Sequence, residues 1–257
     1  MKENTEKLLC WLADDQDDSY KETFTITYAE LELLLPKLTA GGRRSLIRYL
    51  ADQRLIRTER LGRQTYISLT SHGREALSAQ LPAFREGFRR WQGEWSCLTF
   101  CEAPAGDPGF RYLRQLLLSH QAFSLSRGVY LYPGTLPSEV QHVCRQLYLG
   151  SVVVFTIKEW QFGDERSLVN EQYMLSDVAE LLSGISREIN LLLGEFENEK
   201  ELTHSFQKQI FSVFDRLFEI IVQDPGITHH YFPQVEHGIE LLGKLRQLYR
   251  RNNVKIT

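Results

Sequence analysis

Residues 37–67 read KLTAGGRRSLIRYLADQRLIRTERLGRQTYI, and this stretch decides how the first part of the chain folds. Thr39 can cap a helix that continues to about Gln53, because its side chain can accept a hydrogen bond from the first helical turn. Residues 55–61 and 63–70 then predict two strands joined by a turn at Gly62, since β-branched and aromatic residues recur in them. The sequence therefore predicts a helix followed by a hairpin.

The same stretch is strongly basic, although the chain as a whole is acidic. It holds eight basic and two acidic residues, so its formal charge is 8 − 2 = +6, and the remaining residues of this −3 chain sum to −9. The basic residues are Lys37, Arg43, Arg44, Arg48, Arg54, Arg57, Arg60 and Arg63. A local basic patch on an acidic body is typical of a protein that contacts a polyanion with one face. The order of helix and basic hairpin indicates double-stranded DNA as that polyanion.

At helical spacing, the exposed side of the predicted helix carries Arg44, Ser45, Arg48 and Tyr49, with Arg43 near its border. We expect Arg44, Ser45 and Arg48 to enter a major groove, where arginine can contact guanine edges. Arg60 and Arg63 flank the hairpin tip and can contact the DNA backbone. The predicted DNA-binding residues are Gly42, Arg43, Arg44, Ser45, Arg48, Tyr49, Arg60 and Arg63.

Each of these features also has a plain structural interpretation. An arginine-bearing helix face is often only a solvated surface, whereas the Gly41–Gly42 pair, near a helix N-terminus that favours anions, lets the backbone approach a phosphate closely. A basic hairpin can be an edge strand that charge protects from pairing. The combination of features in this order favours DNA binding over these separate interpretations.

The residues before this stretch predict two further helices. Apolar residues recur at helical spacing in residues 5–13, and Thr27 with Glu30 forms a capping-box pattern before the segment 28–38. Three helices and a basic hairpin together predict a winged helix-turn-helix domain over residues 1–81.

Residues 82–162 predict a connector followed by a ferredoxin-like domain. The expected elements are a strand at 95–101, a helix at 109–120, two strands bent near Arg127–Gly128, a second helix and a buried strand at 151–157. The resulting βαββαβ order is that of the ferredoxin-like plan. Residues 163–257 predict a C-terminal helical domain with three long amphipathic helices, and we expect Phe206, Phe211, Phe214 and Phe218 to pack in its core. The fold class is thus α+β with several domains.

The other compositional signals indicate no specific chemistry. Four scattered cysteines do not form a disulfide framework, and no apolar run approaches the length of a membrane helix, so we expect a cytoplasmic protein with no membrane contact. Cys97 and Cys101 share a strand face, a geometry that favours core cysteines over a zinc site. Glu102 and Asp107 could in principle hold a metal, but a surface role is favoured. We expect no catalytic residues, no metal, no cofactor and no enzymatic activity.

The chain resembles the PaaX-like transcriptional regulators, the family of the phenylacetic acid catabolism repressor. Four stretches carry the resemblance over nearly the full length: RRSLIRYLADQRLIRTERLGRQTYISLTSHGREAL, WQGEW before CEAP, GVYLYPG, and QDPGITHHYFPQVEHGIELLGKLRQLY. The resemblance implies a homodimeric repressor with the three domains described above. Tyr49 departs from the family pattern, which often has arginine there, and QAF at 121–123 replaces a glycine-rich bend.

These observations together predict a sequence-specific DNA-binding transcription regulator, a repressor that acts as a homodimer on a palindromic operator. A small-molecule effector of unknown identity is a further partner that this function allows. Two alternatives stay open at this point. One is a metal-dependent nuclease of the ferredoxin-like type found in CRISPR spacer acquisition, and the other is a protein-interaction scaffold.

Overall fold

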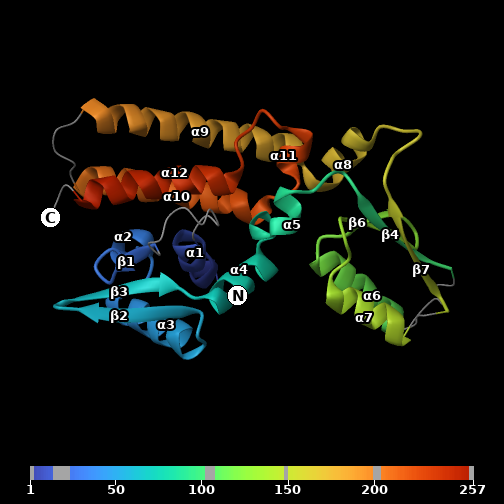
Figure 1. The fold of residues 1–257 in the computed structure, drawn as a ribbon, viewed down its shortest axis with the longest axis horizontal. Helices are drawn as coiled ribbons and strands as arrows, with labels where there is room; N and C mark the ends of the chain where they lie inside the picture. The colour runs from blue at the N-terminus through green and yellow to red at the C-terminus, as the bar shows by residue number, and fades with distance from the viewer. Residues whose placement is uncertain (1–2, 14–23, 102–107, 148–149, 199–203, 255–257) are drawn as a thin grey trace.

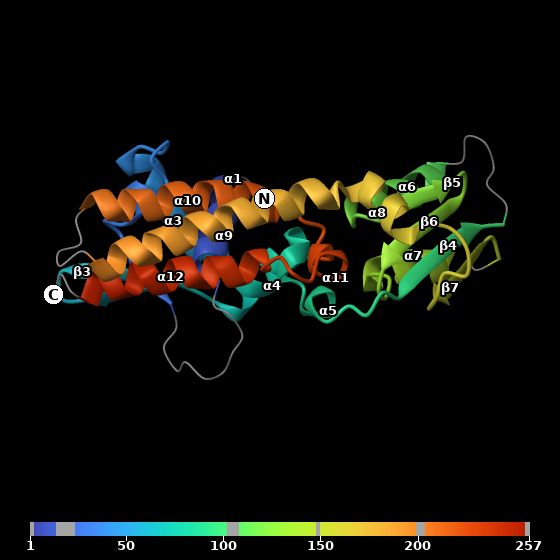
Figure 2. The same ribbon diagram turned by 90° about the horizontal axis from the view of Figure 1, so that it is seen from above.

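The computed structural model describes residues 3–13, 24–101, 108–147, 150–198 and 204–254. The protein has an α+β fold with one three-stranded and one four-stranded antiparallel sheet. Figure 1 shows an elongated molecule, with the three-stranded sheet beneath long C-terminal helices at one end and the four-stranded sheet at the other. The view from above in Figure 2 shows the same elongated shape. Across the described residues, no helix is both long and apolar enough to traverse a lipid bilayer.

The first part of the chain contains seven elements: α1 (Glu3–Leu12), β1 (Thr25–Thr27), α2 (Leu31–Leu34), α3 (Ala40–Asp52), β2 (Ile56–Leu61), β3 (Gln64–Leu69) and α4 (Ser71–Gln80). The predicted helices at 5–13 and 39–53 and the predicted hairpin are confirmed. Thr39 caps α3 by accepting a hydrogen bond from the Gly42 N–H at 3.1 Å. The hairpin turns at Gly62, whose φ of +61° is one that glycine adopts readily.

The segment between α1 and α3 differs from its prediction. The sequence predicts a helix over 28–38, but α2 has only four residues and ends at Leu34. Leu35 leaves the helical conformation because a residue before proline disfavours it. Thr27 ends the short strand β1, which pairs with β3, and Glu30 accepts a hydrogen bond from the Thr27 N–H. A strand of three residues is too short to produce a recognisable alternation, so the sequence did not reveal β1.

The middle part begins with η1 (Pro82–Phe84) and α5 (Glu86–Arg89) and continues with β4 (Trp95–Phe100), α6 (Pro108–Ser119), β5 (Phe123–Ser126), β6 (Val129–Pro133), α7 (Ser138–Leu147) and β7 (Val152–Ile157). The four strands lie in the order β5-β6-β4-β7. Figure 1 shows α6 and α7 side by side on one face of this sheet, and the two helices contact each other. The predicted bend near Arg127–Gly128 is confirmed, with Gly128 at a φ of +83°.

Strand β7 was predicted to be buried, and this expectation is wrong. Val153, Val154 and Phe155 are 49, 46 and 49% exposed, because β7 is an end strand of the sheet and pairs only with β4 among the described strands. An uninterrupted apolar run predicts burial on both faces, but the position of a strand within a sheet is not encoded in its own residues.

The last part is helical: α8 (Glu165–Tyr173), α9 (Leu175–Asn198), α10 (His204–Gln223), α11 (Thr228–Tyr231) and α12 (Gly238–Val254). The three predicted long helices are confirmed. The sequence did not predict α8, although the Asp164 side chain caps it by accepting from the Ser167 N–H at 3.1 Å. The expected core role of the phenylalanines is confirmed, since all four are at most 4% exposed, namely Phe206, Phe211, Phe214 and Phe218.

The buried apolar residues form two clusters. The first joins the elements from α1 to η1 with α9, α10 and α12, and the second fills the middle part together with Val169, Leu175 and Ile227. Trp11 lies at the centre of the first cluster, fully buried, with its ring centroid 4.6 Å from that of Phe214 and 5.7 Å from that of Tyr249. The Arg246 guanidinium also donates to the Cys10 carbonyl at 3.1 Å. The C-terminal helices therefore hold α1 directly; the three predicted domain ranges remain a prediction.

A tight turn after α10 lies where the two clusters meet. The buried Asp224 carboxylate accepts from the Gly226 N–H at 2.9 Å and from the Thr228 hydroxyl at 2.7 Å. Gly226 has a φ of +83°, and a Cβ there would approach the Pro82 carbonyl oxygen at 2.8 Å. Glycine is therefore required here both by its backbone conformation and by the close approach of η1.

Candidate nucleic-acid interface

Helix α3 presents its polar side to solvent because its apolar side is anchored in the first cluster. Leu50 is fully buried and Ile47 is 6% exposed. Arg44, Ser45, Arg48 and Tyr49 are all exposed, as the helical spacing predicted. In Figure 1, α3 and the β2–β3 hairpin lie on the side of the molecule away from α9 and α12. The structure thus leaves this face of α3 uncovered by the described residues.

Arg43 does not share this surface. It is only 9% exposed, and its guanidinium donates to the Leu38 carbonyl at 2.6 Å and lies 3.7 Å from the Glu32 carboxylate. These contacts tie the start of α3 to the turn that follows α2. Arg43 therefore stabilises the position of α3, and it is not placed to reach a ligand in front of the helix.

Arg48 and Tyr49 project freely. The Arg48 side chain is 87% exposed and lies 4.0 Å from the Asp52 carboxylate, one turn further along the helix. An exposed ion pair at this separation contributes little to stability and gives way easily to a better partner. Tyr49 is 57% exposed, which is unusual for a large aromatic side chain. Both residues can therefore be reoriented towards a ligand at low energetic cost.

Gly42 plays a different part from the one the sequence suggested. Its N–H donates to the Thr39 hydroxyl, so this donor is already used within the helix cap. Gly41 is exposed, and an added Cβ there would meet only the Thr39 hydroxyl at 4.0 Å. Gly41 is thus the residue of the pair that allows close backbone approach to the first turn of α3.

The hairpin carries the remaining predicted residues at its tip. Arg60 pairs with Thr65 in the register of β2 with β3, and Arg63 lies in the turn beside Gly62. Both arginines are exposed, and among the described residues neither has an ion pair or hydrogen-bond partner. The same holds for Arg44 on α3. By contrast, Arg57 is held by Glu59 at 3.0 Å.

Tyr28 is a residue that the sequence did not single out. Its hydroxyl is buried without a hydrogen-bond partner in the described part of the chain. Burial raises the pKa of Tyr28, and the nearby positive charges of Arg44 and Arg43 only partly oppose this effect. The hydroxyl is thus an unsatisfied polar group near the start of α3, and its burial keeps it out of reach of a ligand at the surface. The only sequence signal that could have identified Tyr28 is the presence of an aromatic residue shortly before α2.

The arrangement as a whole is a surface of exposed arginines: Arg44, Arg60 and Arg63 have no ion pair or hydrogen bond among the described residues, and Arg48 has only its exposed pair with Asp52. These four arginines come from two adjoining elements, since α3 packs against β2. Guanidinium groups that are not neutralised within the protein can form charge-assisted hydrogen bonds with phosphate oxygens or bidentate contacts with bases.

The predicted metal candidates cannot be placed, because Glu102 and Asp107 lie outside the described residues. Within the described ranges, no group of three or more histidine, cysteine, aspartate or glutamate residues is arranged to hold a metal ion. The expected core position is confirmed for Cys97, which is buried, but is wrong for Cys101, which is exposed because β4 ends at Phe100; both are free thiols. Burial raises the pKa of the Cys97 thiol.

No protein-family model matches this chain, and no curated protein matches its sequence. Among solved structures, the chain is similar to an uncharacterized protein, Rv0674, from Mycobacterium tuberculosis. The two share 15% sequence identity, the alignment covers 97% of each chain, and the TM-score is 0.47.

Proposed function

We propose that this protein is a sequence-specific DNA-binding transcription regulator, a repressor of the PaaX-like type that acts as a homodimer on a palindromic operator. The observation that carries the proposal is the set of exposed arginines on α3 and at the hairpin tip, of which Arg44, Arg60 and Arg63 have no partner in the described part of the chain.

The order of elements supports a winged helix-turn-helix. The chain runs α1-β1-α2-α3-β2-β3, and the first strand joins the hairpin in the sheet order β1-β3-β2. In such a module, the helix that precedes the hairpin inserts into the major groove. Arg44, Ser45 and Arg48 are then the base-reading residues, and Arg60 and Arg63 grip the sugar-phosphate backbone.

The energetics of the two groups differ. A bidentate arginine–base contact contributes about 1–3 kcal/mol of discrimination against a wrong base. A phosphate contact contributes affinity that falls with salt and is independent of sequence. The α3 residues are therefore expected to set specificity, and the hairpin arginines are expected to set general affinity. Arg43, whose guanidinium is occupied inside the protein, has no direct part in this proposal.

The rest of the chain supports a scaffold role in the proposal. The βαββαβ order and the strand order β5-β6-β4-β7 agree with a ferredoxin-like domain. The C-terminal helices pack on α1 through Trp11 and Arg246, and so form a rigid base for the DNA-binding module. Control by a small-molecule effector is compatible with this layout.

Selection of bound fragments from random DNA tests the proposal. A regulator of this kind enriches a two-fold symmetric consensus, and fluorescence anisotropy then shows tighter binding to that consensus than to a scrambled duplex. Enrichment of no motif, together with equal affinity for all duplexes, would overturn sequence-specific recognition. Salt-insensitive or absent DNA binding by a folded protein would favour a protein-interaction scaffold, and Mg²⁺- or Mn²⁺-dependent cleavage would favour a nuclease.

A further inference from the structure

Strand β7 exposes an apolar surface at one end of the central sheet. Residues 152–157 read VVVFTI and include no charged residue. Val153, Val154 and Phe155 are each close to half exposed, although they are adjacent and large. An exposed, uncharged and apolar edge strand is a ready template for pairing with another strand.

The backbone of β7 shows which groups face outward. The Cys101 N–H donates to the Ser151 carbonyl at 2.9 Å, in the same register that pairs Thr99 with Val153. In an antiparallel ladder, hydrogen-bonded and non-bonded pairs alternate, so Val153 and Phe155 direct their backbone groups towards β4. The N–H and C=O groups of Val152, Val154 and Thr156 therefore point away from β4, where no described strand pairs with them.

The opposite edge of the sheet is protected, and β7 is not. Strand β5 has only four residues, and its register shifts between Ser124 and Ser126, which marks a bulge. Bulges and short strands are common devices that prevent edge-to-edge pairing. Strand β7 pairs with β4 over six residues without a register shift and contains no proline. One edge is thus closed to pairing, and the other is open.

We propose that β7 pairs antiparallel with β7 of a second copy of this chain, so that two four-stranded sheets form one continuous sheet across a two-fold axis. A register centred on Val154 uses the outward backbone groups of Val152, Val154 and Thr156 and forms about six ladder hydrogen bonds. It places Val153 opposite Phe155 of the second copy, and these pairs bury each other's apolar side chains.

The charge pattern of the edge suits a second copy as the partner. In a two-fold pair, each residue meets residues of the same strand, so a charged edge would often face like charges. In the register centred on Val154, Lys158 lies opposite Gly150 of the second copy, and every pair between them is uncharged. No like charges therefore meet when the strand pairs with itself, so the isologous pairing has no electrostatic penalty in this register.

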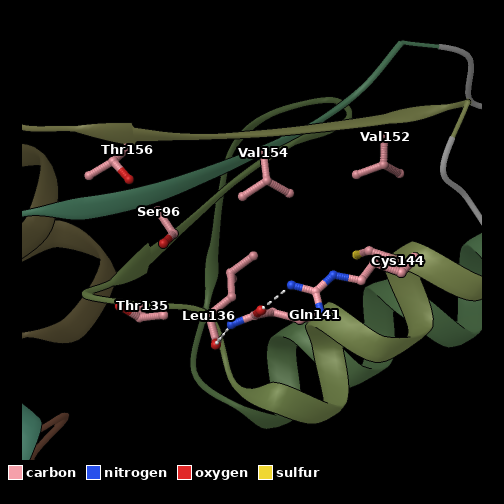
Figure 3. Close-up of a pocket in the computed structure, with 9 residues that line it drawn as sticks. Ser96, Thr135, Leu136, Gln141, Cys144, Val152, Val154 and Thr156 are labelled. Atoms are coloured by element: carbon pink, nitrogen blue, oxygen red, sulfur yellow. Dashed lines mark hydrogen bonds between the residues drawn. The ribbon is translucent and has the colours of Figure 1, made fainter.

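A cleft of about 390 Å³ beside β7 would become part of the same interface. Figure 3 shows Val152 and Val154 pointing into this cleft from β7, towards Cys144 and Gln141 on α7. A second β7 strand would lie along the outer side of the cleft and bring α7 of each copy to the same face of the joined sheet. The apolar wall that Val152 and Val154 form would then be shielded from solvent.

This inference deepens the homodimer of the proposed function, but its test is independent of DNA. Sedimentation velocity measures the dimer dissociation constant of the wild type and of two variants, V154P and F155K. Proline at 154 removes an outward N–H and leaves the ladder with β4 intact, and lysine at 155 places like charges in the interface. L125K on the protected β5 edge is the matched control, since Leu125 is 41% exposed.

We expect a wild-type dimer, a dissociation constant raised by about 30-fold or more in V154P and F155K, and an unchanged constant in L125K. Circular dichroism checks that each variant folds. If V154P misfolds, F155K still tests the inference, because it alters only an exposed side chain. A wild-type monomer at high micromolar concentration, or a dimer insensitive to F155K, would overturn the inference. A dimer that behaves as expected but binds no DNA would instead overturn the proposed function and leave this interface standing.

Discussion

Strands β2 and β7 are both six residues long, and both lie at the end of an antiparallel sheet, each with a single neighbour among the described strands. Strand β2 reads IRTERL and carries Arg57, Glu59 and Arg60, whereas β7 reads VVVFTI and carries no charge. Charge on an edge strand opposes pairing with another chain, and its absence permits pairing. The comparison shows two edges of opposite character, one charged and one apolar, which fits the proposed contact of the first with a polyanion and of the second with a protein strand.

The largest expected effect comes from removing the two arginines of α3 that are proposed to read bases. The double variant R44A/R48A is expected to lose about 10²- to 10⁴-fold in affinity for the selected operator, because each bidentate contact contributes about 1–3 kcal/mol. Fluorescence anisotropy on operator and scrambled duplexes measures the loss. The control is R114A, an exposed arginine on α6 far along the chain. Equal losses on both duplexes would contradict base reading by α3.

A second test converts β2 into an edge like β7. The variant R57V/E59V/R60V is expected to self-associate in light scattering, because an apolar edge replaces a charged one. It should also lose roughly five- to tenfold in affinity for any duplex through the missing phosphate contact. The matched variant R57T/E59T/R60T keeps a polar edge, so it should lose the same DNA affinity without self-association. Self-association of both variants would show that charge is not the protecting feature of β2.

A smaller effect is expected from the hairpin tip alone. R63A should weaken binding to operator and random DNA alike, by a few-fold, and lower the slope of log affinity against log salt by about 1. R48A should instead weaken operator binding selectively. Titrations over a range of salt concentrations separate the two. A selective loss in R63A, with an unchanged salt slope, would assign base reading to the hairpin.

The smallest effect is expected at Arg43, whose guanidinium is occupied by the Leu38 carbonyl. R43M should reduce the free energy of unfolding by about 1 kcal/mol, the typical net value of a hydrogen bond. Denaturant unfolding measures this loss. The salt slope of DNA binding should stay that of the wild type. A slope reduced as in R63A would show that Arg43 contacts phosphate.

Local sequence signals predicted the helices and strands with strong periodicity or clear caps. Thr39 marked the start of α3, and Gly62 marked the hairpin turn, because capping and positive φ depend on neighbouring residues alone. The exposed side of α3 followed from helical spacing. The elements that the sequence did not reveal, β1, α8 and α11, are short or have few apolar residues, so they form no distinct pattern.

The sequence by itself thus determined the order of the longer helices and strands, the basic stretch at residues 37–67 and the outward direction of Arg44 and Arg48. Only the tertiary structure decided that Trp11 packs against the C-terminal helices, that Arg43 is buried, and that β7 lies at an open edge. The physical reason is the distance along the chain over which the deciding interactions act. Caps, turns and helical periodicity depend on residues within about one or two turns, whereas burial at Trp11, Arg43 and β7 depends on which distant segment covers each residue.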